Sequence, residues 1–328
     1  MPNMLNLLNF LFRPRSSAAP TTPVEPPALP ASNPSASPST FGDSFSSHSG
    51  TRDFGTSSTA PALSRPTVDL STRASRQTGR IPSLSASTKH ALIELSDPES
   101  VTSLEDFASR IEKIDNIFSA NGDPRGAFPA LYRVITNQAV TSVREGLYED
   151  NEWGSEQATD FGELYLKNLH GHLTGGRVSP GWQRYYALAD NPNVSLERVV
   201  SVGATIHLVV DLPNSLARIG TSGEREADFM RFGDILLEAY PQMIASARAG
   251  YGIDMSNIFG LFIFGNIADV VTGEGTATRF GFQAIRTKAW TFGQWLQDIR
   301  WAPAKSEITI SWRSIDGILA NLDAAKIL

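Results

Sequence analysis

From about residue 87 onward, apolar residues recur every three or four positions, which is the spacing of amphipathic helices. The clearest case begins at Ser103, whose hydroxyl can cap a helix with two acids in its first turn, and should stop at the turn around Asn121. The apolar face of this segment comprises Leu104, Phe107, Ile111, Ile114 and Phe118. The spacing therefore predicts a helix between Ser103 and Asn121.

The same spacing predicts further helices. Their starts are Pro129, Ser155, Ser179 and Ser195, and later helices are expected over residues 229–239, 258–271, 282–296 and 315–328. Pro213 is expected to kink or break the fifth helix, and Pro303 to mark a break before the last one, where residues 308–312 alternate and could be extended. We find no repeat and no strand–helix alternation. The pattern predicts an all-α, multi-helix single domain, too large for a four-helix bundle.

The first 90 residues have a different composition. They hold 18 Ser and 12 of the 20 Pro, whereas every Trp and Tyr lies from Tyr132 onward. Without aromatic and apolar anchors such a segment cannot bury enough surface to offset its ordering entropy. We therefore predict a long disordered Ser/Pro-rich segment over residues 1–90 and the helical domain over residues 91–328.

Three interpretations of this segment stay open. It can be a linker or tail, an export signal like the flexible, Ser-rich and acid-poor starts of bacterial effectors, or an organelle transit peptide. Residues 1–42 contain a single acid, Glu25. A secretory signal peptide is disfavoured, because Arg13 and Arg15 follow the apolar stretch instead of preceding it.

Composition excludes several classes of protein. The absence of Cys removes disulfide frameworks, thiolate zinc sites and cysteine nucleophiles. The net charge is +4 over residues 1–90 and −10 over the remainder, so the folded part is not expected to bind nucleic acid. The most apolar internal stretch, Ile258–Val271, is shorter than the ~20 residues that span a bilayer, so we expect a buried helix and no transmembrane segment.

The most distinctive short segment is Gly203–Pro213, in which His207 and Asp211 stand four apart among apolar residues. Side chains at this spacing share one helix face. The pair can bind a divalent metal ion together, or Asp211 can orient the imidazole of His207 so that its other nitrogen acts as a base. The alternative is a hydrogen-bonded core pair that fixes helix packing.

A second candidate is the pair His170 and His172, near the Gly175–Gly176 end of the third predicted helix. Residues two apart do not face each other on a helix, and a histidine near a helix C-terminus also interacts favourably with the helix dipole. If either approached His207 and Asp211, the set would suit zinc or another divalent ion. The phosphate-loop, nucleophile-elbow and His-Glu-x-x-His motifs do not occur.

Six short blocks occur in the same order as in a bacterial family known as domain of unknown function 5995. They are residues 128–136, 146–150, 161–166, Trp182, 203–213 and 286–290. The resemblance covers roughly residues 105–300 and implies an all-helical fold with its focal point at His207 and Asp211. In that family the central block usually carries an Asn where Thr205 stands and another where Val209 stands.

These observations lead to three functional hypotheses. The first is a secreted or translocated bacterial effector that acts on a host protein; without such delivery the protein is expected in the cytoplasm. The second is a metal-assisted hydrolase or lyase using His207 and Asp211, with His170 and His172 as further metal ligands. The third is a helical module that holds a small-molecule ligand, with His207 as its polar anchor.

Overall fold

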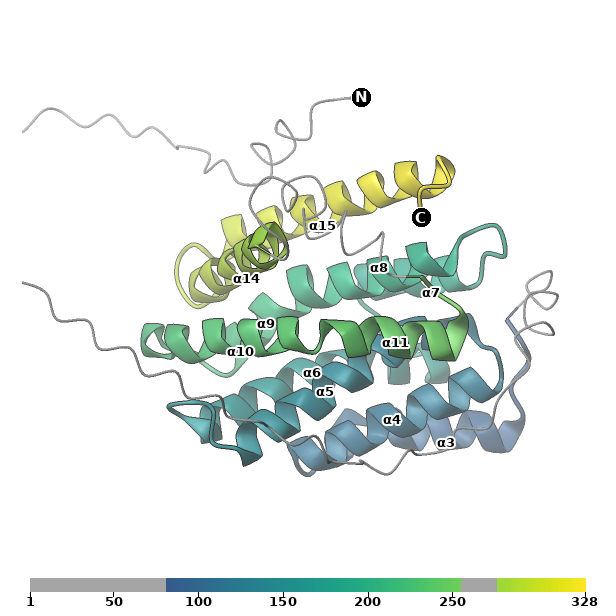
Figure 1. Ribbon diagram of the computed structural model, residues 1–328, viewed down its shortest axis with the longest axis horizontal. Helices are drawn as coiled ribbons and strands as arrows, with labels where there is room; N and C mark the ends of the chain where they lie inside the picture. Colours follow the sequence, from purple (N-terminus) through teal and green to yellow (C-terminus); the bar gives the residue numbers. More distant parts are fainter. Residues whose placement is uncertain (1–80, 255–275) are drawn as a thin grey trace, which may run out of the picture. The chain divides into compact units, whose positions relative to one another are not determined.

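The computed structural model describes residues 81–254 and 276–328, and within these two stretches every regular element is a helix (Figure 1). The predicted all-α fold is therefore confirmed. The elements are α3 (Ala86–Ser96), η1 (Pro98–Ser100), α4 (Leu104–Ala120), η2 (Pro124–Gly126), α5 (Ala127–Arg144), α6 (Asn151–Thr174), α7 (Pro180–Ala189), α8 (Leu196–Ile206), η3 (His207–Asp211), α9 (Leu212–Arg218), η4 (Gly223–Arg225), α10 (Glu226–Glu238), α11 (Tyr240–Tyr251), α14 (Thr276–Leu296) and α15 (Trp301–Ala324).

Two predictions from the sequence concern residues that the structure does not describe. They are the disordered character of residues 1–80 and the helix over residues 258–271. The helical part begins at Ala86, before the predicted boundary at residue 91, and Ser85 caps α3 by accepting the N–H of Thr88 at 3.0 Å.

Most predicted helix ends agree with the structure. Ser103 accepts the N–H of Asp106 at 3.1 Å to cap α4, and Ser195 caps α8 in the same way. α6 ends at Gly175, whose φ of 74° is the left-handed conformation that glycine adopts readily. The start of α6 was predicted wrongly, because Asp150 provides the cap and the helix begins at Asn151 instead of Ser155.

The C-terminal part departs from two further predictions. α15 runs unbroken from Trp301 to Ala324, so neither the break at Pro303 nor the extended alternative over residues 308–312 occurs. Pro303 lies in the first turn of α15, where its missing N–H would have no intrahelical partner in any case. Helix α11 was not predicted; it follows α10 almost directly and has Pro241 in its first turn.

Pro213 does not break its helix. The chain continues through α8, η3 and α9, and η3 is a π-helical turn in which the N–H of Leu212 bonds to the carbonyl of His207, five residues earlier. Because Pro213 cannot donate a hydrogen bond, the widened turn directly before it accommodates the lost α-helical bond. The turn holds both His207 and Asp211.

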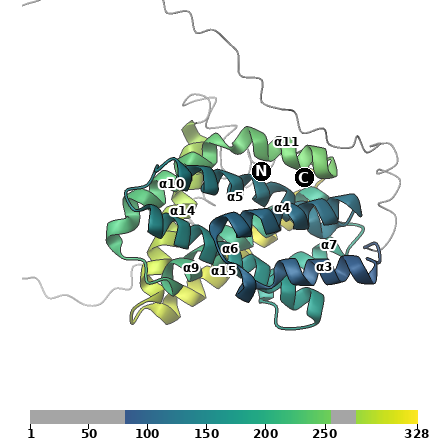
Figure 2. The same ribbon diagram turned by 90° about the horizontal axis from the view of Figure 1, so that it is seen from below.

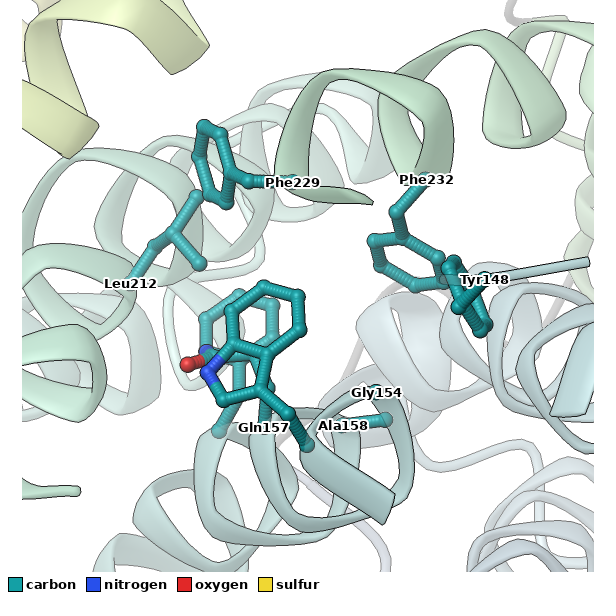
Figure 3. Close-up of a pocket in the computed structure, with 9 residues that line it drawn as sticks. Tyr148, Gly154, Gln157, Ala158, Leu212, Phe229 and Phe232 are labelled. Carbon is teal, nitrogen blue, oxygen red and sulfur yellow. The ribbon is translucent and has the colours of Figure 1, made fainter. Parts of the chain in front are cut away.

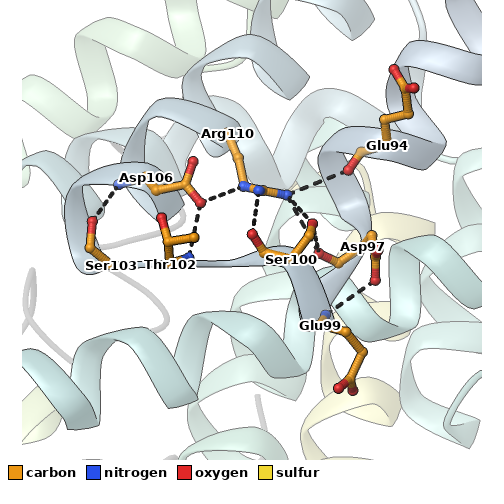
Figure 4. A network of polar contacts seen from close by, with 8 residues as sticks. All are labelled: Glu94, Asp97, Glu99, Ser100, Thr102, Ser103, Asp106 and Arg110. Carbon is orange, nitrogen blue, oxygen red and sulfur yellow. Dashed lines mark hydrogen bonds and ion pairs between the residues drawn. The ribbon is translucent and has the colours of Figure 1, made fainter.

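A network centred on Arg110 fixes the connection between α3 and α4 (Figure 4). Its guanidinium donates to Asp106 Oδ2 at 2.8 Å and to the carbonyl and hydroxyl of Ser100 at 2.7 and 2.9 Å. Asp106 also accepts the N–H of Thr102 at 3.1 Å. The planar guanidinium of one half-buried side chain, Arg110, thus ties the linker to the first turn of α4.

α5 is the central helix of the packing, because it contacts α4, α6, α8, α10 and α11, while α14 packs against α9, α10 and α15 (Figures 1 and 2). Two buried apolar clusters result. The larger includes Phe107, Phe128, Tyr132, Tyr165, Leu169, Trp182, Tyr185, Val200 and Ile206. The smaller consists of Trp153, Phe161, Leu212, Leu216, Phe229, Ala289 and Trp290.

The helix over Leu196–Arg218 has the length and hydropathy of a membrane span, with a mean hydropathy of 1.3 in its most apolar window. However, 72% of that window is buried inside the fold, as in the core helix of a globular domain.

Candidate functional site

His207 and Asp211 form a direct hydrogen-bonded pair in the π turn. His207 Nδ1 lies 3.0 Å from Asp211 Oδ2, and the two residues are only 3% and 5% exposed. Trp182 of α7 donates its indole N–H to the same carboxylate oxygen at 2.9 Å. The sequence-predicted pair is thus brought together, and a third residue that sequence reasoning had not assigned to the site joins it.

The partners of Asp211 fix the tautomer of His207. An ionised carboxylate only accepts hydrogen bonds, so Nδ1 of His207 carries the proton and Nε2 presents a lone pair. Nε2 is buried and has no hydrogen-bond partner among the described residues. Burial lowers the pKa of His207 despite the opposing effect of Asp211, so the ring is neutral at pH 7.

Aromatic rings surround the imidazole. Phe161 of α6 stacks on it with ring centroids 3.7 Å apart and an interplanar angle of 14°, while Tyr132 and Phe128 approach edge-on at 4.6 and 5.3 Å. The imidazole therefore lies in an apolar interior, which is compatible with a hydrogen-bonded core pair and with a buried site.

Phe161 also lines a pocket (Figure 3). It has a volume of about 330 Å³ including space open to solvent, and its walls come from the loop before α6 and from α6, α9 and α10. The lining residues are Tyr148, Trp153, Gly154, Gln157, Ala158, Phe161, Leu212, Phe229 and Phe232. Phe161 therefore belongs both to the pocket wall and to the surroundings of His207.

Gln157 is the one amide among these otherwise apolar and aromatic lining residues. Its Nε2 donates to Ser215 Oγ at 3.1 Å, and Ser215 donates in turn to Asp160 Oδ1 at 2.6 Å. The carbonyl oxygen of Gln157 is buried and has no partner among the described residues. Asp160, the last residue in this series of hydrogen bonds, forms an ion pair with Arg218, whose Nε lies 2.5 Å from Asp160 Oδ2.

His170 and His172 are engaged elsewhere. His170 Nδ1 lies 3.1 Å from the carbonyl oxygen of Ile93 in α3. His172 stacks on Tyr186 with centroids 3.9 Å apart, and its Nε2 lies 3.3 Å from Arg125 Nη1. Burial, followed by the charge of Arg125, lowers the pKa of His172.

The four-residue metal set suggested by the sequence is thus not assembled. Over residues 81–254 and 276–328, no group of three or more His, Asp or Glu side chains could hold a metal ion. The physical reason is that helix α6 directs His170 toward α3 and His172 toward Arg125, so neither ring joins the pair formed by His207 and Asp211.

Sequence reasoning missed the pocket itself. Trp153, Leu212 and Phe232 belong to separate helices or helix ends, and nothing in their local spacing shows that they converge. The available indications were Phe229 and Phe232, which share a face of α10 at i and i+3, and Phe161, which stands in one of the blocks of the family resemblance.

The fold and site define an all-helical domain in which a buried His–Asp pair and an aromatic pocket share Phe161. Residues 104–316 match DUF5995, a family of unknown function, and the chain belongs to this family. The match includes the pair and every residue of the pocket. A search of the curated proteins and a search of the solved structures each found no similar protein.

Proposed function

We propose that the helical domain is a binding module for a small apolar molecule, and that the pocket beside Phe161 is its binding site. The observation that carries this proposal is the lining: five aromatic rings, three small or aliphatic residues and one amide. Concave sites with mostly apolar walls and few polar groups are typical of small-molecule binding. Burying a ligand there would remove apolar surface from water on both partners.

Much of the pocket volume is open to solvent and the enclosed part is small, so the proposed ligand is no larger than a single ring. The wall at Gly154 is tightly packed, because a Cβ at that position would lie 2.8 Å from the ring of Tyr148. A ligand of about seven non-hydrogen atoms should bind with a dissociation constant of roughly 0.1 to 1 mM, given the binding energy per atom that small ligands reach. In this proposal His207 serves the site by stacking on Phe161, and Asp211 and Trp182 serve it by holding His207 in place.

Calorimetric titration with toluene tests the proposal. Ala158→Leu fills the pocket and should weaken binding at least about tenfold by steric exclusion. Glu156→Leu, an exposed site on the same helix, is the matched control and should bind as the wild type does. Absence of toluene binding to the wild type, or equal binding by Ala158→Leu, would contradict the proposal.

A second candidate is the metal-assisted hydrolase or lyase centred on His207. It is favoured by the carboxylate that orients the imidazole, by the lone pair left on Nε2 and by the π turn, a geometry frequent at functional sites. A substrate would have to displace Phe161 to reach the ring. The test is to measure the metal content of the wild type and of His207→Ala. If neither protein contains metal, the hypothesis is wrong.

For the biological role we propose delivery into a host cell as an effector. Its support is the composition of residues 1–90, which are rich in Ser and Pro and poor in acids. A translocation assay with these residues fused to a reporter tests the idea, and a reporter that no secretion system delivers would exclude it.

A further inference from the structure

A buried cation lies behind the wall of the pocket that α10 forms. Arg286 of α14 is 1% exposed, and its guanidinium carbon lies 4.1 Å from the ring centroid of Phe229 and 5.6 Å from that of Phe232. Both phenyl rings line the pocket, whereas Arg286 does not. In Figure 3 the ring of Phe229 extends toward Leu212 and the ring of Phe232 toward Tyr148, with Gln157 and Ala158 on another helix.

The position of Arg286 is fixed. Its Nη2 donates to the carbonyl oxygen of Phe229, and Gly233 leaves room for the side chain, because a Cβ there would lie 2.5 Å from Nε of Arg286. Burial lowers the pKa of Arg286 to about 9, which still leaves the group charged at pH 7. Phe229 and Phe232 therefore contact both a permanent positive charge and the pocket.

The acidic groups nearby do not enter the pocket lining. Asp228 accepts the backbone N–H groups of Glu149 and Asp150 at 2.8 and 2.9 Å. Asp234 accepts a hydrogen bond from Gln283 at 2.8 Å. No carboxylate is thus among the lining residues to attract a cation.

We propose that Arg286 determines the charge specificity of the pocket, which accepts neutral apolar ligands and rejects cations of the same shape. This inference rests on the proposed binding function. Five aromatic rings would by themselves suit a quaternary ammonium group, whose charge is attracted by ring faces. Here a guanidinium already interacts with Phe229, so a cation bound against the same ring would be repelled by a like charge.

Two ligands of equal shape test the proposal. Choline and 3,3-dimethylbutan-1-ol differ in that a charged nitrogen replaces a carbon. A titration of each against the full chain compares ligands of equal shape, and Arg286→Met separates the effect of this guanidinium from the greater hydration of the choline cation. The wild type should bind the neutral alcohol at least about tenfold more tightly. Arg286→Met keeps the length of the side chain and removes its charge, and should reduce that preference or reverse it.

The outcomes separate this inference from the function on which it rests. If toluene binds but choline binds as tightly as the neutral alcohol, or if Arg286→Met keeps the full preference, the charge selection is wrong while the binding module stands. If toluene does not bind, the proposed function fails and the selection falls with it. The comparison of the two ligands on the wild type does not depend on whether the variant folds.

Discussion

The ring of Phe161 lies flat against the imidazole of His207, with centroids 3.7 Å apart, and the same ring forms part of the pocket wall. This contact joins two features that are separate in the sequence. The carboxylate of Asp211 holds His207, and His207 in turn holds Phe161. We therefore propose that His207 and Asp211 serve the pocket by holding Phe161 in place.

Removal of Asp211 should destabilise the fold strongly. Asp211→Ala leaves the N–H groups of His207 and Trp182 buried without their acceptor, so we expect a loss of about 2 to 5 kcal/mol in the free energy of unfolding. Urea denaturation measures this loss. Because His207→Ala removes one of the same interactions, the double variant should lose less than the sum of the two single losses. Strict additivity would show that the pair does not act as a unit.

Acid should destabilise the protein through His207. Since burial lowers its pKa below the ordinary ~6.5, the unfolded chain binds a proton that the native state does not, once the pH falls below ~6.5. The free energy of unfolding should then decrease by up to about 1.4 kcal/mol per pH unit down to the native pKa. Denaturation between pH 7.5 and 5 should show a shallower decrease for His207→Gln. An identical slope in both proteins would contradict the assignment.

His172 should also lower the free energy of unfolding as the pH falls, because burial lowers its pKa as well. Its smaller burial predicts a smaller effect. The variant His172→Gln should therefore reduce the acid dependence less than His207→Gln does, in the same denaturation series.

Two glycines inside helices should respond oppositely to alanine. At Gly233 a Cβ would lie 2.5 Å from Nε of Arg286, so Gly233→Ala should cost about 1 to 3 kcal/mol through overpacking. At Gly317 in α15 no atom lies within 4 Å of the added Cβ, so Gly317→Ala should stabilise by about 0.5 to 1 kcal/mol. Thermal unfolding of both variants checks the two signs.

Asp228 should hold the loop between α5 and α6. Its two carboxylate oxygens accept the N–H groups of Glu149 and Asp150, so Asp228→Ala should speed hydrogen exchange at those amides and cost about 1 to 3 kcal/mol. Asp254→Ala removes one partner of an exposed ion pair with Arg248 and should change stability by less than about 1 kcal/mol. Unchanged exchange in Asp228→Ala would refute the role of this carboxylate.

Most of the helices could be predicted from interactions between residues close in the sequence. The caps at Ser103 and Ser195 and the glycine at 175 act through neighbours in the sequence, so the chain shows them directly. The start of α6 and the continuity of α15 were missed because a proline or polar residue permits more than one local structure. Pro303 illustrates this, since it fits the first turn of a helix as well as a break before one.

Only part of the candidate site could be predicted from the sequence. The contact between His207 and Asp211 follows from helical spacing. The contribution of Trp182, 29 positions from Asp211, and the pocket depend on how separate helices pack. The same holds for Arg286, which lies 57 positions from the carbonyl of Phe229 that it contacts.

The most direct test of the account is a crystal structure of the protein soaked with bromobenzene, read from the anomalous signal of bromine. We predict one bromine peak inside the pocket, between Phe161 and Phe229, with the His207–Asp211 hydrogen bond intact. A pocket without bromine, in a crystal where the probe binds elsewhere on the same molecule, would contradict the binding function.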